Sequence, residues 1–123
     1  MTEEANIASK KFQKEINAGT VSLVLLSVLE RAEEPMYGYQ IAKRVESAGD
    51  GVPMMKQGAI YPVLRSLEAS GLLESRVEPS VSGPPRRYYS ITAEGRETLS
   101  RWTGIWGRTR TFVDKIVKGT SDV

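Results

Sequence analysis

The residues best suited to chemistry lie between residues 56 and 70, where polar and apolar side chains are arranged with helical spacing. Apolar positions recur at i, i+3, i+4 and i+7, which would bury one side of a helix: Ile60, Val63, Leu64 and Leu67. The other side carries hydrogen-bonding and basic groups: Lys56, Gln57, Tyr61 and Arg65. A glutamine can pair in bidentate fashion with adenine, and a lysine or an arginine can contact phosphate or guanine. The spacing suits a helix that reads the major groove of DNA, although an ordinary amphipathic surface helix has the same pattern.

A second basic cluster, Arg86 and Arg87, follows the turn-forming residues Gly83, Pro84 and Pro85. Arginine is attracted by the negative potential of the minor groove, and the two prolines stiffen the approach. Because side chains alternate along a strand, only one of the two arginines needs to face DNA, and we favour Arg86. The alternative is a basic strand edge that prevents aggregation.

Tyr37 is a further candidate, at the start of a helix predicted over residues 37–47. A helix N-terminus favours anions, so Tyr37 is placed to lie beside a phosphate of the DNA backbone. An ordinary packing role explains this residue equally well.

The 123 residues include neither Cys nor His. Their absence excludes thiolate and imidazole zinc sites as well as Cys and Ser–His nucleophiles. No carboxylate lies in a motif with a nucleophile, a phosphate-binding glycine loop or metal-ligand spacing, so we expect no enzyme, no metal and no cofactor. The longest uncharged stretch, residues 16–29, is shorter than the roughly 20 residues of a membrane-spanning helix, and no secretion signal is visible. We expect a cytoplasmic protein without membrane contact.

The net charge is only +2, and residues 1–92 carry 11 basic and 11 acidic side chains. A protein that binds nucleic acid usually has a clear basic excess. Total charge therefore does not support DNA binding, and only the local basic clusters do.

The elements that would position these side chains follow from periodicity and turn residues. Helices are predicted over residues 18–31, 37–47 and 56–70, with a short helix near 10–15 and a frayed start over 1–9. Two strands are predicted around residues 73–77 and 87–91, and Thr92 would cap a last helix reaching Lys118. Three helices followed by a β-hairpin make a winged helix-turn-helix, so the fold class is mainly α with a small β-hairpin. We expect this domain over 1–92 and a C-terminal dimerisation helix and tail over 93–123.

Three segments carry a family resemblance: residues 36–41 (MYGYQI), residues 58–68 (GAIYPVLRSLE) with 71–73 (GLL), and residues 84–95 (PPRRYYSITAEG). In this order and spacing they resemble the PadR family of bacterial transcriptional regulators, over roughly residues 18–118. The resemblance implies a homodimeric DNA-binding repressor whose last helix supplies much of the dimer interface, as in short members. It also associates Tyr61 with DNA contact, and several members respond to small aromatic or drug-like compounds.

Residues 93–118 have a short heptad pattern, which is typical of helices that pack against a partner helix. Ile105 and Phe112 widen the apolar face beyond what one partner helix covers. The residues predicted for the dimer interface are Leu99, Trp102, Trp106, Val113 and Ile116.

Two glycines, Gly104 and Gly107, lie in the interior of this last helix. Each costs up to about 1 kcal/mol relative to alanine. We hypothesise that they leave room for a small planar aromatic effector that stacks beside Trp102, Ile105 and Trp106. Alternatively, both tryptophans belong to the interface core and the glycines only permit close approach of the helices.

The resulting hypothesis is repression by occupancy of double-stranded DNA. A symmetric dimer would hold two reading helices at the spacing of a palindromic operator. An effector between the last helices would alter that spacing and release the DNA. The alternative is a winged-helix module that binds another protein without sequence-specific DNA binding.

Overall fold

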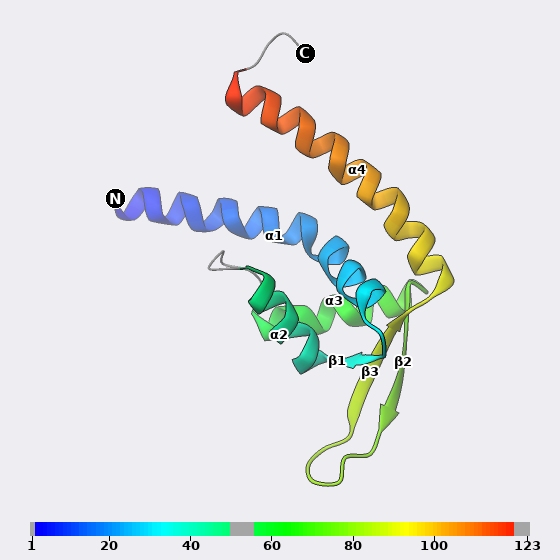
Figure 1. Ribbon diagram of the computed structural model, residues 1–123. Coiled ribbons are helices and arrows are strands. Elements are labelled where there is room, and N and C mark those ends of the chain that lie inside the picture. Colours follow the sequence, from blue (N-terminus) through cyan, green and yellow to red (C-terminus); the bar gives the residue numbers. More distant parts are fainter. Residues whose placement is uncertain (1, 50–55, 120–123) are drawn as a thin grey trace.

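The computed structural model describes residues 2–49 and 56–119. The turn residues Asp50, Gly51 and Pro53, which the sequence predicts to separate two helices, lie outside the described residues. The order of elements is α1 (Glu3–Arg31), β1 (Met36–Tyr37), α2 (Gly38–Gly49), α3 (Gln57–Ala69), β2 (Leu73–Glu78), β3 (Arg86–Ile91) and α4 (Ala93–Lys118), as drawn in Figure 1. This is the predicted mainly helical fold with a β-hairpin and a C-terminal helix.

The sheet has three strands rather than the two predicted. Its order is β1-β3-β2, and all neighbours are antiparallel. The additional strand, β1, pairs Met36 with Tyr89 and Tyr37 with Tyr88. Because β1 leads directly into α2, this pairing fixes the start of α2 against the middle of β3.

The first helix begins earlier than predicted. Instead of a frayed end and a short separate helix, α1 runs without a break over Glu3–Arg31. Thr2 caps it by accepting a hydrogen bond from the backbone N–H of Ala5 at 3.1 Å. Glu3 and Glu4 lie in the first turn, where negative side chains stabilise a helix. The prediction for residues 1–17 missed this N-terminal signature.

The core is formed by the C-terminal half of α1, the buried sides of α2 and α3, the base of the sheet and the start of α4. Leu26, Ile41 and Leu64 are fully buried within it. Thr92 caps α4 as predicted, since its hydroxyl accepts from the Gly95 N–H at 2.9 Å. That hydroxyl also donates to the Gly71 carbonyl at 2.7 Å, and the Thr92 backbone N–H donates to the Leu72 carbonyl at 3.1 Å, which ties the start of α4 to the loop after α3.

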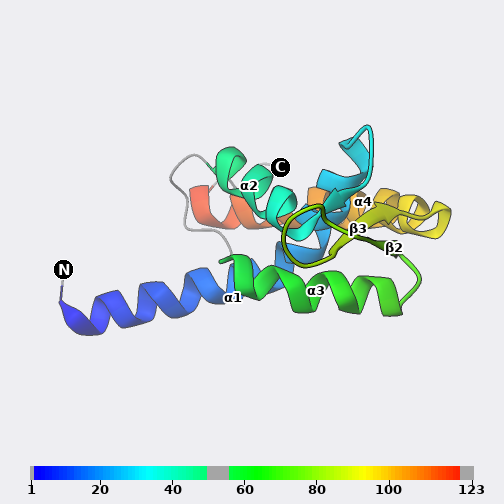
Figure 2. The same cartoon turned by 90° about the horizontal axis from the view of Figure 1, so that it is seen from below.

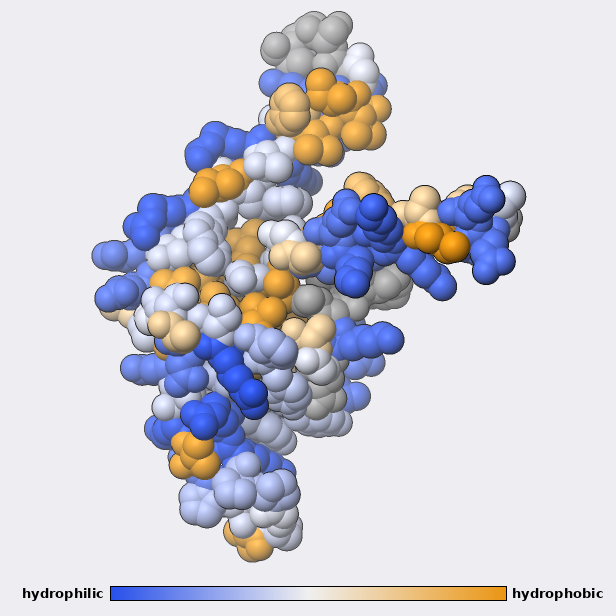
Figure 3. Space-filling view, turned by 180° about the vertical axis from the view of Figure 1, so that it is seen from behind, coloured by the Kyte–Doolittle hydropathy of each residue, from blue (hydrophilic) through white to orange (hydrophobic). Residues whose placement is uncertain are grey.

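The long helices α1 and α4 diverge away from this core, and the N-terminal half of α1 and the C-terminal half of α4 project as two arms (Figure 1). Apolar side chains remain exposed on both arms, as the orange areas at the end of α4 and on the α1 arm in Figure 3 illustrate. They are Ile7, Phe12 and Ile16 on α1, and Ile105, Trp106, Phe112, Val113, Ile116 and Val117 on α4. Among the helices that the structure describes, none has the length and apolar composition needed to cross a membrane.

Candidate nucleic-acid interface

The helix α3 and the β2–β3 hairpin lie together at one end of the molecule, which faces the viewer when the protein is seen from below (Figure 2). Lys56 is the N-cap of α3 and is exposed, and its side chain makes no capping hydrogen bond. Arg65 is exposed about one turn before the end of the helix at Ala69. Ile60, Leu64 and Leu67 are buried, so the predicted apolar side of this helix is confirmed. The side chain of Gln57 lies outside the described part of the chain.

Tyr61 occupies a different position from the one its helical spacing predicts. Instead of projecting freely, its side chain is half-buried and packs against the core. Its ring contacts Gly38, the first residue of α2, where even a Cβ atom would overlap the ring atom Cε1. The helical pattern within residues 56–70 cannot reveal this contact, because it depends on how α2 crosses α3.

The two arginines of the hairpin lie on opposite faces of β3. Arg87 shares a face with Tyr89, since side chains two apart along a strand point the same way, and its guanidinium donates to Ser75 Oγ at 2.9 Å. Arg86 points to the other face, and its guanidinium carbon lies 4.5 Å from the centre of the Tyr37 ring. A cation over an aromatic face is attracted by the ring's electrons. The strand thus separates the two arginines, as alternation predicts.

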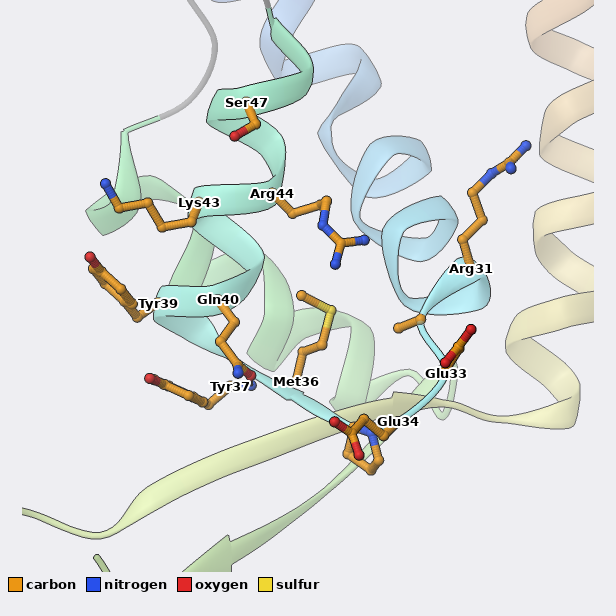
Figure 4. A pocket seen from close by; sticks show the side chains of 12 residues that line it. Arg31, Glu33, Glu34, Met36, Tyr37, Tyr39, Gln40, Lys43, Arg44 and Ser47 are labelled. Carbon is orange, nitrogen blue, oxygen red and sulfur yellow. Dashed lines mark hydrogen bonds between the residues drawn. The ribbon is translucent and has the colours of Figure 1, made fainter.

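Tyr37 belongs to an aromatic row that continues along α2. Its ring stacks with that of Tyr39 at 6.4 Å between centres and meets Tyr88 edge-on at 5.4 Å. The ammonium of Lys43 lies 5.7 Å from the centre of the Tyr39 ring. Figure 4 shows Tyr37, Tyr39 and Lys43 pointing to the same side of α2. Two basic groups, Arg86 and Lys43, therefore stand at the ends of a pair of tyrosines.

Sequence reasoning missed Tyr39 and Lys43 as members of this row. The i, i+4 spacing of the two residues was the available signal, because side chains four apart are neighbours on a helix. The backbone N–H of Tyr37 donates to Gln40 Oε1 at 3.1 Å, which closes the first turn of α2 in the manner of a capping box. Beside this turn lies a mixed-charge hollow of about 650 Å³, whose lining includes Arg31, Glu33 and Arg44 (Figure 4).

A polar cluster connects α3 to the opposite face of the hairpin. The Tyr89 ring is 3% exposed and lies at its centre. Burial raises the pKa of the Tyr89 hydroxyl above its usual 10.0 and the charge of Glu68 raises it further, whereas Arg87 and Arg65 act to lower it. Charged side chains of α3 and β3 therefore gather around one buried hydroxyl.

The residues predicted for an effector line a cavity between α1 and α4. Trp102, Ile105 and Trp106 contribute to its wall, as do Phe12 and Ile16 of α1, and its volume is about 730 Å³. An added Cβ at Gly107 would meet nothing within 4 Å, and at Gly104 only Arg108 Nη1 at 3.5 Å. The glycines do not line this cavity: they border a second hollow together with Phe112, so they are not the residues that leave room beside the tryptophans.

The residues predicted for a dimer interface divide into two groups. Leu99 is buried in the core of its own chain and Trp102 packs against that core. Trp106, Val113 and Ile116 are exposed on the α4 arm. Only the second group offers surface that a partner can cover fully.

Several solved structures are similar to this chain. The PadR family transcriptional regulator from Eggerthella lenta DSM 2243 is 29% identical, with a TM-score of 0.82 over 98% of this chain and 100% of that one. A transcriptional regulator from Clostridium thermocellum is 28% identical, with a TM-score of 0.74 over 84% of this chain and 95% of its own. Bacillus subtilis PadR in complex with operator DNA is 21% identical, with a TM-score of 0.61 over 68% of this chain and 47% of that one, which shows a shared fold alone.

Sequence comparisons agree with the structural ones. A curated relative from Lysinibacillus sphaericus, an uncharacterized protein, is 26% identical over 98 residues, which are 80% of this chain and 87% of the relative. Residues 25–101 match the sequence model of the family described as "Transcriptional regulator PadR-like family". The match spans more than half of the chain and includes the hairpin, α2 and α3, so the predicted resemblance is confirmed. Family and fold are those of transcriptional regulators rather than enzymes, and the chain belongs to the PadR-like family.

Proposed function

We propose that this chain is a repressor that binds a palindromic operator in double-stranded DNA as a homodimer. The observation that carries the proposal is the convergence of basic and aromatic side chains from α2, α3 and the hairpin at one end of the molecule. Lys56 and Arg65 are exposed on α3, and Arg86, at the loop end of the hairpin, is held over Tyr37. In helix-turn-helix docking the N-terminal half of the second helix enters the major groove. Lys56, Gln57 and Tyr61 lie in that half of α3.

The remaining contacts would come from the hairpin and from α2. Arg86 approaches the minor groove, where arginine is favoured by a concentrated negative potential. Tyr37 and its hydroxyl lie beside Arg86, at the position where the first helix of the motif meets the DNA backbone. Backbone contacts of this kind fix the register of the protein on DNA, and base contacts by α3 specify the sequence.

The exposed apolar arms support the homodimer. Large contiguous apolar surfaces on a soluble protein mark interaction sites, and a two-fold dimer matches a palindrome. Trp106, Val113 and Ile116 of the C-terminal dimerisation helix, residues 93–123 with its tail, would contact the partner. Phe12 and Ile16 add a second apolar surface on α1 that the sequence pattern did not predict to be part of an interface. Leu99 and the inner side of Trp102 serve the core of the chain, so the interface would begin beyond them.

The cavity between α1 and α4 supports a small planar aromatic effector. Trp102 and Trp106 lie on its wall and can stack on a flat molecule. A ligand seated there contacts both arms and would change the distance between the α3 helices of the two subunits. This change would lower the affinity for an operator whose half-sites have a fixed spacing. Release of DNA by the effector is part of the proposal.

The proposal is tested by binding to DNA fragments from the region upstream of the protein's own gene, at several salt concentrations. Counterion release makes DNA binding weaken steeply with salt. Arg86→Ala should weaken binding roughly tenfold, in the range of a lost charged contact. Tyr61→Phe keeps the ring on Gly38 and removes only the hydroxyl, so it tests the contribution of that hydroxyl to DNA binding while the close packing is retained. Arg108→Ala removes the same charge from exposed α4 and serves as the control.

Two outcomes would contradict the proposal. Binding to every fragment only at low salt, unchanged by Arg86→Ala, would show non-specific attraction. Absence of DNA binding, together with capture of a partner protein through an association that resists salt, would favour the protein-binding winged-helix module instead.

A further inference from the structure

One chain of hydrogen bonds joins α3 to both strands of the hairpin. The Ser75 hydroxyl, on β2, donates to Glu68 Oε2, in the last turn of α3, at 2.5 Å. The same oxygen accepts a hydrogen bond from Arg87 Nη1, on β3, at 2.9 Å. Each bond has a charged partner, and such bonds are about twice as strong as neutral ones. Ser75 therefore connects three elements through a single atom.

The surroundings of this chain show that it is part of the packed molecule. Ser75 and Glu68 are both half-buried. Ser75 pairs directly with Tyr89 across the sheet, and Tyr89 is buried. On this face of the hairpin the side chains therefore turn to α3, whereas Arg86, on the other face, lies over Tyr37 of β1.

We propose that Glu68, Ser75 and Arg87 form a clamp that fixes the angle of the hairpin relative to α3. In this assignment Arg87 is a positioning residue, and Arg86 is the arginine that contacts DNA. The inference rests on the DNA binding proposed above and assigns to its two basic hairpin residues different tasks.

The angle set by the clamp bears on sequence specificity. A winged-helix protein that places α3 in the major groove and the hairpin in the minor groove makes both contacts at once only if their separation fits the DNA. A hairpin that swings freely can still reach phosphates on any sequence, because backbone contacts carry no sequence information. Loss of the clamp should therefore reduce specific binding more than non-specific binding.

The experiment compares hairpin variants on two DNA probes. One is a duplex selected from a random-sequence pool by the wild-type protein, and the other is a duplex of unrelated sequence. Ser75→Ala removes both hydrogen bonds at once, and Ser75→Thr retains the hydroxyl on a residue that favours strands. Ser80→Ala is the matched control, because within residues 2–49 and 56–119 its hydroxyl bonds to the carbonyl of Ser82 in the hairpin loop and not to α3.

The clamp predicts that Ser75→Ala weakens binding to the selected duplex about tenfold. Binding to unrelated DNA should not change. The salt slope, which is the slope of the logarithm of the binding constant against the logarithm of the salt concentration, should not change either. Ser75→Thr should restore wild-type affinity, and Ser80→Ala should have no effect. Arg87→Ala leaves the bond between Ser75 and Glu68 in place, so it should weaken specific binding less than Ser75→Ala does. The double variant should be no weaker than Ser75→Ala, because the Ser75–Arg87 bond is already lost in that variant. Arg86→Ala should instead lower affinity for both duplexes and reduce the salt slope by about one.

The assignment would be overturned if Arg87→Ala reduced the salt slope as much as Arg86→Ala does. It would also be overturned if Ser75→Ala bound the selected duplex as tightly as the wild-type protein does. Amide hydrogen exchange in the free protein tests the clamp without DNA. Ser75→Ala should speed exchange in β2 and β3, and Ser80→Ala should not. If the wild-type protein selects no duplex but the exchange result holds, the proposed function fails and the clamp stands. If the wild-type protein selects a duplex, but Ser75→Ala changes neither the affinity for it nor the hydrogen exchange of β2 and β3, the clamp is refuted and the proposed function stands.

Discussion

The ring of Tyr61 in α3 lies directly on the backbone of Gly38, the residue with which α2 begins. No side chain fits between them, since an added Cβ would overlap Cε1 of the ring and lie 2.8 Å from Cζ. This contact sets how closely the two helices of the helix-turn-helix approach each other. It also holds the Tyr61 hydroxyl at a fixed place beside the proposed DNA surface.

Gly38→Ala should therefore destabilise the protein and displace Tyr61. Overpacking of a close contact costs typically about 1–3 kcal/mol, measured as a lower midpoint of urea unfolding. Gly58→Ala in α3 is the control, because its added Cβ meets nothing within 4 Å and alanine favours a helix. Equal stability of the two variants would contradict the packing described here.

Glu68→Gln should lower the pKa of Tyr89, because it removes a negative charge that raises that pKa. Burial still acts to raise this pKa in the variant, and Arg87 and Arg65 still act to lower it. The change is measured by ultraviolet absorbance of the phenolate during an alkaline titration. A Tyr89 pKa that does not move would show that Glu68 does not face the hydroxyl.

The Tyr89 hydroxyl also makes the stability of the folded protein depend on pH in the alkaline range. As the pH rises through 10.0, the unfolded chain loses this proton before the folded chain does. The stability contributed by neutral Tyr89 is thus complete below 10.0 and is lost as the pH rises through the folded pKa. In Glu68→Gln the loss should be smaller, which urea unfolding at a series of alkaline pH values measures. A Tyr89→Phe variant should lose this component entirely.

Ile116→Asp should convert the proposed dimer to a monomer. The side chain is 68% exposed on the α4 arm, so a charge costs little in one chain but would be buried between two. Light scattering during gel filtration measures the mass. Val81→Asp, in the hairpin loop, introduces the same charge at a fully exposed position and should leave the dimer intact. A wild-type protein with the mass of one chain would contradict the interface.

Gly107→Ala should stabilise an isolated chain by up to about 1 kcal/mol, since alanine favours the helix and meets nothing nearby. In the dimer the added methyl group would occupy space that we assign to a partner helix. Titration of planar aromatic compounds against tryptophan fluorescence should give a response in the wild type, and Gly107→Ala should retain it, because Gly107 lies outside the cavity that Trp102 and Trp106 line. No response by the wild-type dimer to a broad panel would argue against the effector site.

Local signals in the sequence were sufficient for most elements. The helical spacing of Ile60, Leu64 and Leu67, the cap at Thr92 and the alternation of Arg86 with Arg87 each depend on neighbours along the chain, and the structure has them as predicted. Gly71 after α3 has φ of 81°, the left-handed conformation expected at a helix end.

The features that the sequence did not predict depend on residues far apart in the chain. Strand β1 has two residues, too few for an alternating pattern, and exists because Met36 and Tyr37 pair with β3. The positions of Tyr61 on Gly38 and of Arg86 over Tyr37 likewise require the crossing of elements to be known. The early start of α1 is different, because the cap at Thr2 followed by Glu3 and Glu4 is a local signal that was available.

The buried residues of α1 all lie within its C-terminal half: Val21, Leu25, Leu26 and Leu29. The turns before them have no core to pack against in one chain, and helices gain most of their stability from such packing. In the proposed dimer, folding of these turns and association become one equilibrium. The melting temperature of the protein should then rise with its concentration, as mass action requires for a fold completed by a second copy.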